Sequence, residues 1–243
     1  MNFPQNLPSE LKDCINLSAF KYLPFDTDIF GYPFFRIDSN SIEKGESELV
    51  KLKKSLRKFA CDVKVKSTDL KLINKFEKLG FRKICNQVTL KADLVDLDLV
   101  TDPEVIEVSS IDDDCLSEHS SNFTKDRLSM DQRIEKSIVR KFYTTWISNS
   151  FTYKKKKVYL LHSGLSILHR PENIVKIDLL SVLEKRKKTG SRLLSHSLHD
   201  AKLNVAKHAV VTTEINNLSA IDFYCNFGFR KDIVMTCMHL VHA

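Results

Sequence analysis

The sequence of 243 residues predicts an α/β fold built from two related units. Residues 174–240 alternate strand-like and helix-like runs, in the order strand, basic turn, helix, strand, helix, strand. Residues 75–83 (KFEKLGFRK) resemble residues 223–231 (FYCNFGFRK), and each run lies between a helix-like and a strand-like stretch. A Gly-Phe pair after a helix can be a simple helix stop, but the matching Arg-Lys and following strand favour a repeat. We expect an α/β half unit at 1–95 and a second domain at 96–243.

The composition is that of an ordinary globular protein, with 42% hydrophobic and 28% charged residues. No run of 18 apolar residues occurs, so we expect no transmembrane helix. Residues 1–14 lack the basic and apolar regions of a signal peptide. The six cysteines are scattered and form no C-x-x-C pair, which is typical of reduced thiols. These features predict a cytoplasmic protein.

The formal net charge of +7 favours an anionic partner, either nucleic acid or a small polyanion. The basic residues do not gather on one arm or one helix face. The run of four at Lys154–Lys157 precedes a strand-like stretch, as a solvated turn does. No zinc finger or RNP-type aromatic strand occurs. We therefore expect a small polyanion as partner, with no nucleic acid and no membrane.

The first distinctive run along the chain is Tyr22–Ile37, where aromatic residues crowd around a Gly and a Pro. Such a run is typical of a buried loop that enters a strand. A second interpretation is a substrate lip, because aromatic faces stack on sugar rings and bases. The candidate substrate-binding residues are Phe30, Gly31 and Tyr32.

The middle of the chain predicts a linker and a long helix. Residues 93–114 are Asp-rich, and Leu and Asp alternate at 94–99, which predicts an extended edge strand followed by a linker. Apolar residues recur every four positions in 125–150, which predicts a helix with a core-facing side. Trp146 belongs to this side, and we interpret it as a core anchor.

The last quarter of the chain predicts a phosphate-binding site. A strand at 174–182 leads into the basic turn Arg186–Ser191 and then into a helix. The N-terminus of a helix presents backbone N–H groups and a positive dipole end, and both favour bound phosphate. The two histidines at 196 and 199 have a spacing that can hold zinc, but no third ligand is placed, so we expect no metal.

These residues resemble the GCN5-related N-acetyltransferase (GNAT) superfamily. Its acetyl-CoA loop, Arg/Gln-x-x-Gly-x-Gly/Ala, corresponds to Arg186–Ser191, and its second motif corresponds to Asn217, Ala220, Tyr224 and Gly228-Phe229. The resemblance implies an α+β GNAT fold with a mixed, mostly antiparallel sheet flanked by helices, the N-terminal half being a smaller GNAT-like unit. It implies acetyl-CoA as co-substrate, bound by Leu180, Val182, Arg186, Lys187, Lys188, Thr189, Gly190, Ser191, Arg192 and Asn217.

The sequence departs from this loop pattern at Thr189 and Ser191, which stand where glycines are expected. Thr is β-branched and disfavours positive φ, so we expect Thr189→Gly to bind CoA at least as tightly as the native chain.

The resemblance gives Tyr224 the role of protonating the departing CoA thiolate, and its hydroxyl suits that step because its pKa is close to that of a thiol. Asp178, which strand alternation places with Lys176 and Leu180, is a candidate base, as is Asp69; a water chain is a third possibility. A second function stays open, in which a degenerate GNAT fold binds or scaffolds without catalysis. Tyr224 together with Asn217 favours the enzyme.

Within the superfamily, three stretches resemble the dTDP-fucosamine N-acetyltransferase branch. They are the opening Phe25-Asp26 to Phe30-Gly31, the run 79–81 (LGF), and the stretch from Ser121 to Ser150. This resemblance implies a small-molecule amine as acceptor, on a nucleotide-linked amino-deoxysugar. A homodimer is a further expectation.

Overall fold

The computed structural model describes residue 11, residues 14–184 and residues 188–242. The chain packs into two compact units. Unit 1 comprises Met1–Asn86 and Val234–Ala243, and unit 2 comprises Gln87–Ile233. The boundary at residues 95 and 96 that the sequence suggested stays a prediction about domains. Two long strands, β4 (Arg82–Asp93) and β10 (Arg230–His242), supply residues to both units.

Unit 1 is a sheet of strand order β1-β2-β3-β10, where β1 is Phe20–Tyr22, β2 is Phe34–Ile37 and β3 is Phe59–Lys66. The β2–β3 pair is parallel, and the β1–β2 and β3–β10 pairs are antiparallel. The aromatic run of the N-terminus forms helix α2 (Pro24–Phe30) between β1 and β2, with a short 3₁₀ turn (Ser39–Ser41) after β2. Pro24 opens α2 and Gly31 closes it at φ 73, as expected from their backbone preferences.

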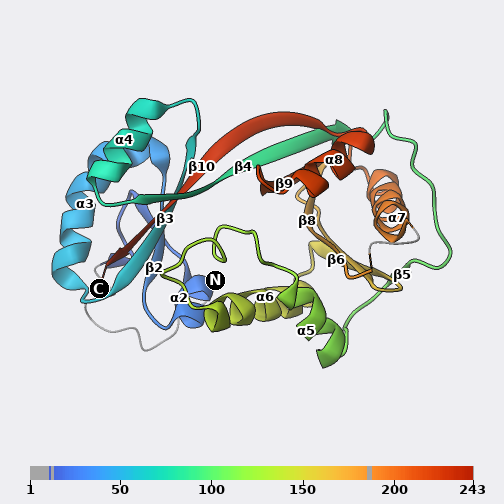
Figure 1. The fold of residues 1–243 in the computed structure, drawn as a ribbon, viewed down its shortest axis with the longest axis horizontal. Helices are drawn as coiled ribbons and strands as arrows, with labels where there is room; N and C mark the ends of the chain where they lie inside the picture. Colours follow the sequence, from blue (N-terminus) through green and yellow to red (C-terminus); the bar gives the residue numbers. More distant parts are fainter. Residues whose placement is uncertain (1–10, 12–13, 185–187, 243) are drawn as a thin grey trace. The chain divides into compact units, whose positions relative to one another are not determined.

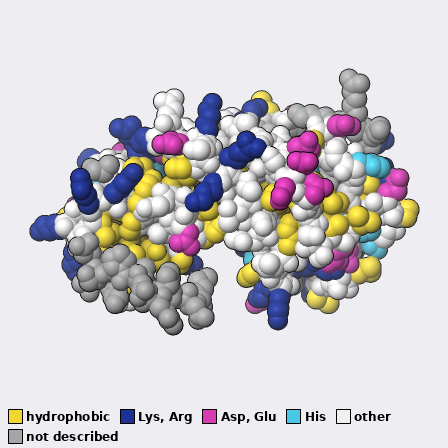
Figure 2. Space-filling view, turned by 90° about the horizontal axis from the view of Figure 1, so that it is seen from below, with side chains coloured by type: hydrophobic (Ala, Val, Ile, Leu, Met, Phe, Trp, Pro, Cys, Tyr) yellow, Lys and Arg dark blue, Asp and Glu magenta, His cyan; other side chains and the backbone are white. Residues whose placement is uncertain are grey.

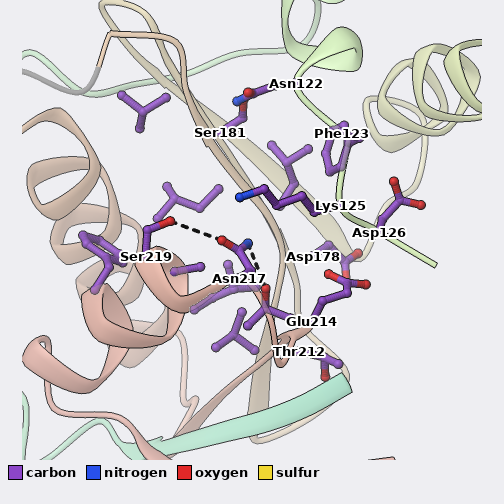
Figure 3. A pocket seen from close by; sticks show the side chains of 18 of the residues that line it. Asn122, Phe123, Lys125, Asp126, Asp178, Ser181, Thr212, Glu214, Asn217 and Ser219 are labelled. Atoms are coloured by element: carbon purple, nitrogen blue, oxygen red, sulfur yellow. Dashed lines mark hydrogen bonds between the residues drawn. The ribbon is translucent and has the colours of Figure 1, made fainter. Parts of the chain in front are cut away.

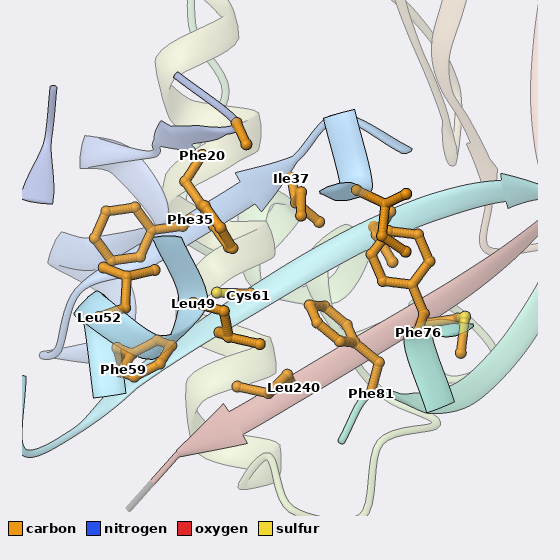
Figure 4. Packing of buried hydrophobic residues seen from close by; sticks show 14 of the residues in the cluster. Phe20, Phe35, Ile37, Leu49, Leu52, Phe59, Cys61, Phe76, Phe81 and Leu240 are labelled. Atoms are coloured by element: carbon orange, nitrogen blue, oxygen red, sulfur yellow. The ribbon is translucent and has the colours of Figure 1, made fainter. Parts of the chain in front are cut away.

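Helices α3 (Ile42–Ser55) and α4 (Leu70–Lys78) bury their apolar sides on the unit 1 sheet (Figure 1). Figure 4 shows the resulting core, in which Leu49 and Leu52 of α3 and Phe76 of α4 meet strand residues. Phe35 and Phe59 are fully buried there and pack edge to face, with ring centroids 6.3 Å apart. This core is aromatic and apolar, so unit 1 has a hydrophobic centre of its own.

The strands of unit 2 follow the order β4-β9-β8-β7-β6-β5. Its strands are β5 (Ile106–Glu107), β6 (Lys156–Leu161), β7 (Gly164–His169), β8 (Ile174–Val182) and β9 (His208–Glu214), together with β4. Among the described pairs of unit 2, only β8–β9 is parallel; the others are antiparallel. The fold is therefore α/β with mixed, mostly antiparallel sheets, and this expectation from the sequence is confirmed.

Helices cover both faces of the unit 2 sheet. Helices α5 (Asp113–Ser121) and α6 (Lys136–Ser150) lie on one face, where Ile147 packs with Leu165, Ile167 and Leu179. Helix α7 (Thr189–Leu203) lies on the other, where Tyr159 approaches His196 and a glycine of β7 adjoins Thr189. The last helix, α8 (Leu218–Asn226), connects β9 to β10.

The repeat that the sequence suggested has the same local structure in both copies. Helices α4 and α8 both end one residue before a non-glycine C-cap, which is followed by a glycine at positive φ: 99° at Gly80 and 108° at Gly228. The Phe81 amide donates to the Phe76 carbonyl (3.0 Å), and the Phe229 amide donates to the Tyr224 carbonyl (2.9 Å). Phe76 and Tyr224 thus occupy equivalent positions in two helix–glycine–strand units.

Two expectations about local structure were wrong. Residues 94–99 form a turn and loop instead of an edge strand, because the Asp96 amide turns back to the Asp93 carbonyl (3.1 Å) and both Leu94 and Leu97 are buried. The helix expected from residue 125 begins at Lys136, because Asp126 and Asp131 bind nearby backbone amides and hold residues 126–133 in turns.

On the face that Figure 2 shows, Lys and Arg side chains stand apart from one another, and most Asp and Glu side chains lie over a different part of this face. No helix in the described part of the chain is long and apolar enough to cross a membrane.

Candidate functional site

The site is a cavity of about 780 Å³ whose lining residues all belong to unit 2. It opens where two neighbouring parallel strands stop pairing. The β8–β9 ladder runs from Ile174 and His208 only to Ile177 and Val211, although both strands continue. Residues 177–182 of β8 and 211–214 of β9 line the cavity beyond this point. The edge of β8 that β9 leaves uncovered can pair with an extended ligand in the manner of an added strand.

A bulge in β8 lies at the mouth of this opening. On β7, Ile167 pairs with Leu179 and Leu168 pairs with Ile177, so Asp178 is an extra residue in the ladder. The Asp178 carboxylate forms an ion pair with the Lys156 amine (2.9 Å). That amine also lies over the Trp146 ring of α6. Asp178 therefore points to the α6 face with Leu179. The expectation that it shares a face with Leu180 was wrong, because strict alternation ignores the bulge.

The first turn of α7 forms another wall of the cavity. Lys188 precedes the helix in the left-handed conformation, at φ 57, and its own side chain does not cap the helix. The first helical bond there runs from the Arg192 amide to the Lys188 carbonyl (3.0 Å). The three preceding amides have no acceptor within the helix, and such a terminus attracts phosphate. The positive φ falls on Lys188, whereas Thr189 is helical and buried, so the backbone reason for Thr189→Gly does not apply.

The structure brings most of the predicted CoA residues to this cavity. Its lining includes Leu180, Val182, Lys188, Thr189, Gly190, Ser191 and Asn217. Arg192 is not among the lining residues; its guanidinium binds Asp102 (2.6 Å) and Glu104 instead. The predicted Arg186 and Lys187 lie outside the described residues. The cofactor role of each of these residues stays a prediction.

Tyr224 lines the cavity from α8 and is buried. Burial raises the pKa of its hydroxyl, so this group keeps its proton throughout the neutral range. No described residue hydrogen-bonds this hydroxyl, while Phe223 and Phe229 pack around the ring. Asn217 precedes α8, donating to Thr213 Oγ1 (3.2 Å) and accepting from Ser219 (3.2 Å), as Figure 3 shows. A protonated, unengaged hydroxyl in a cavity can donate a proton to a bound ligand.

The predicted substrate residues belong to unit 1. Phe30 is buried and ends α2, Gly31 is its C-cap, and Tyr32 stacks edge to face on Phe30 (5.8 Å) with Lys58 over its ring (4.4 Å). None of the three lines the unit 2 cavity. The candidate base Asp69 is also in unit 1, where its carboxylate caps α4 by accepting from the Leu72 amide (3.0 Å).

Four charged residues of the cavity were missed by sequence reasoning. Lys125, Asp126 and Arg127 come from the segment between α5 and α6, and Glu214 ends β9. Figure 3 shows the Lys125 side chain reaching into the cavity toward Asn217, and Glu214 and Asp178 are two of the carboxylates that line it. Glu214 accepts a hydrogen bond from Gln87 (2.8 Å), more than a hundred residues away in the sequence. No local motif links these residues, so only the fold brings them together.

A buried histidine also approaches the cavity wall. Nδ1 of His119 in α5 lies 2.8 Å from Oγ of Ser181 in β8. The side-chain amide of Asn122 donates a hydrogen bond to the same Ser181 hydroxyl (3.1 Å). Burial lowers the pKa of His119 to about 4, so its imidazole is neutral at physiological pH. Both Ser181 and Asn122 line the cavity, and this neutral network fixes that part of its wall.

The described residues contain no group of three or more His, Cys, Asp and Glu side chains arranged to hold a metal ion. His196, one of the two histidines with metal spacing, accepts from the Asp102 amide (3.0 Å) through Nδ1. All six cysteines are free thiols.

No protein-family model matches the sequence, and no curated protein matches it. Solved structures do match the fold. A tandem GNAT protein from the clavulanic acid biosynthesis pathway is 12% identical with a TM-score of 0.55, covering 88% of this chain and 76% of its own. A GCN5-related N-acetyltransferase from Sphaerobacter thermophilus is 7% identical with a TM-score of 0.56, covering 86% and 72%.

A further match is a conserved protein of unknown function from Staphylococcus epidermidis ATCC 12228, 12% identical with a TM-score of 0.56, covering 90% of this chain and 89% of its own. These identities are low, so the likeness concerns the fold: the chain has the fold of GCN5-related N-acetyltransferases. The likeness to the dTDP-fucosamine branch stays a prediction.

Proposed function

We propose that the protein is an acetyl-CoA-dependent N-acetyltransferase whose catalytic centre is the unit 2 cavity. One observation carries the proposal. The cavity opens where β8 and β9 stop pairing, and it is lined by both the start of α7 and the buried, protonated Tyr224. Acyl transfer from a thioester with a phosphate-bearing carrier requires three features. They are a strand edge that pairs with the extended carrier, an anion-binding site for its phosphate, and a proton donor for the departing thiolate.

The residues present fit acetyl-CoA as a substrate. The amides at the start of α7 and the Lys188 side chain would hold phosphate, and the β8 edge at 178–182 would accept the amides of the pantetheine arm. Acetyl-CoA supplies an activated acyl group. Tyr224 would protonate the departing thiolate, and Asn217, held by Thr213 and Ser219, would keep the start of α8 in place.

Deprotonation of the acceptor amine falls to the carboxylates of the cavity or to water. Asp178 is engaged by Lys156, which competes with any acceptor ammonium for that carboxylate. Glu214 is buried in the wall and has a neutral hydrogen-bond donor in Gln87. Glu214, Asp178 and the helix cap Asp69 are the candidate proton acceptors.

The acceptor that we propose is an amino group on a small molecule, with a nucleotide-linked amino-deoxysugar as the first to test. The cavity contains both Lys125 and Lys188 and the carboxylates Asp126, Asp178 and Glu214. Because the cavity wall carries both positive and negative charges, it suits a ligand that carries an amine beside an anionic group. Cytoplasmic location and a homodimer stay predictions.

The test is acetyl transfer measured by mass spectrometry on a panel of amines, beginning with dTDP-4-amino-4,6-dideoxygalactose, with its 4-hydroxy counterpart as the matched control. We expect acetyl-CoA to be consumed with an amine and not with the hydroxy counterpart. Binding of acetyl-CoA without transfer to any amine would favour the alternative, a GNAT-fold binding module. Failure to bind acetyl-CoA would overturn both.

A further inference from the structure

Lys125 is a charged side chain of the segment 122–128 that lines the cavity. The segment is fixed on both sides of this residue. Phe123 stacks on Tyr143 with ring centroids 3.9 Å apart, and Asp126 is buried and accepts from the Leu128 amide (2.8 Å). The backbone at Lys125 is thereby held at the wall, and Figure 3 shows its side chain extended into the cavity with the amine directed toward Asn217.

The amine of Lys125 has no hydrogen bond or ion pair with any residue that the structure describes. The carboxylates of the same cavity already have partners. Asp178 binds Lys156 (2.9 Å), and Glu214 accepts from Gln87 (2.8 Å). An amine that is anchored by its backbone and lacks a partner keeps its mobility and remains available to a ligand in the cavity.

We propose that Lys125 is an internal acceptor, acetylated at Nζ by acetyl-CoA bound in the same cavity; this rests on the function proposed above. A primary aliphatic amine is the acceptor class of the proposed reaction, and this one is tethered to the wall of the cavity that Tyr224 and Asn217 also line. A short tether gives an amine a local concentration on the order of millimolar, which an external acceptor must match.

The chemistry balances without a further reactant. The Lys125 ammonium first loses one proton, to a cavity carboxylate or to water. The neutral amine forms the C–N bond, the C–S bond breaks, and the second amine proton leaves as the amide forms. Tyr224 supplies a proton to the thiolate and recovers one from solvent. The products are acetyl-lysine and CoA, and the cavity loses one positive charge.

The experiment is a time course of acetyl-CoA with the deacetylated protein, read by intact mass and by peptide mapping. Calorimetric titration with acetyl-CoA runs alongside. The matched variants are Lys125→Arg, which keeps the charge but is not acetylated, and Lys202→Arg, at an exposed lysine of α7 outside the cavity. Protein concentration is varied to separate transfer within one chain from transfer between chains.

We expect one acetyl group, on the Lys125 peptide, added at a rate that does not depend on protein concentration. Lys125→Arg should abolish this addition, Lys202→Arg should leave it unchanged, and Tyr224→Phe should slow it by ~10²–10⁴-fold. Acetylation of Lys125 no faster than of Lys202, in protein that binds acetyl-CoA, would overturn the inference and leave the proposed function standing. Absence of acetyl-CoA binding would overturn both.

Discussion

At the scale of single residues, Tyr224 carries the proposed chemistry. The hydroxyl is buried, protonated and free of partners among the described residues. Tyr224→Phe keeps the packing of the ring on Phe223 and Phe229, so stability and acetyl-CoA affinity should change little. We expect kcat to fall by ~10²–10⁴-fold, because the acid acts in the transition state. Steady-state kinetics and calorimetry measure the two effects, and a native kcat would remove Tyr224 from the mechanism.

Asp178 and Lys156 form a largely shielded ion pair, with side-chain exposures of 21% and 13%. Loss of one partner leaves the other charge in a poor solvent environment. We expect Asp178→Asn and Lys156→Gln each to lower the free energy of unfolding by ~1–3 kcal/mol, and the double variant to lower it by less than the sum. Denaturant unfolding of the four proteins measures this coupling. Strictly additive losses would show that the pair does not couple.

His119 gives stability a defined pH dependence. Its pKa is lowered by burial to about 4, below its usual value near 6.5 in an unfolded chain. The unfolded state therefore takes up the proton first, and stability falls as pH drops from about 6.5 toward 4, by at most about 3 kcal/mol. His119→Gln should flatten this part of the stability curve. The same slope in both proteins would assign the loss to other groups.

At the scale of elements, the turn into α7 stores backbone strain at Lys188, which adopts φ 57. A left-handed residue with a Cβ costs ~1–2 kcal/mol relative to glycine. We expect Lys188→Gly to gain part of this energy and to raise the unfolding free energy of the ligand-free protein relative to Lys188→Ala, which lacks the same charge. Thermal unfolding of the two variants gives the comparison, and an equal Tm would show that the turn relaxes.

Local patterns predicted the elements around the cavity, and long-range packing decided the rest. The strand at 174–182, the basic turn and the glycine that ends α8 are specified by neighbouring residues, so periodicity and turn chemistry identify them. The bulge at Asp178 depends on the register of β8 with β7. The hydrogen bond between His119 and Ser181 joins residues that are 62 positions apart in the sequence. Lys125 immediately precedes a turn that Asp126 stabilises, a feature that apolar spacing does not reveal.

At the scale of the whole molecule, the two copies of the helix–glycine–strand unit have diverged. The Phe76 ring packs on Phe81 at 5.2 Å, as the Tyr224 ring packs on Phe229 at 5.5 Å, but Phe76 has no hydroxyl and is fully buried in the unit 1 core. We therefore expect unit 1 to make no cofactor contacts and the chain to bind one acetyl-CoA.

The measurement that tests this account most directly is calorimetric titration of the protein with acetyl-CoA, repeated with Ser191→Glu. The variant places a carboxylate in the first turn of α7, where the proposed phosphate-binding site lies. We expect one site per chain, a loss of affinity in the variant, and a gain of about 2.7 kcal/mol in stability at ~100 times Kd. No binding, or equal binding by the native protein and Ser191→Glu, would contradict the assignment of this cavity to acetyl-CoA.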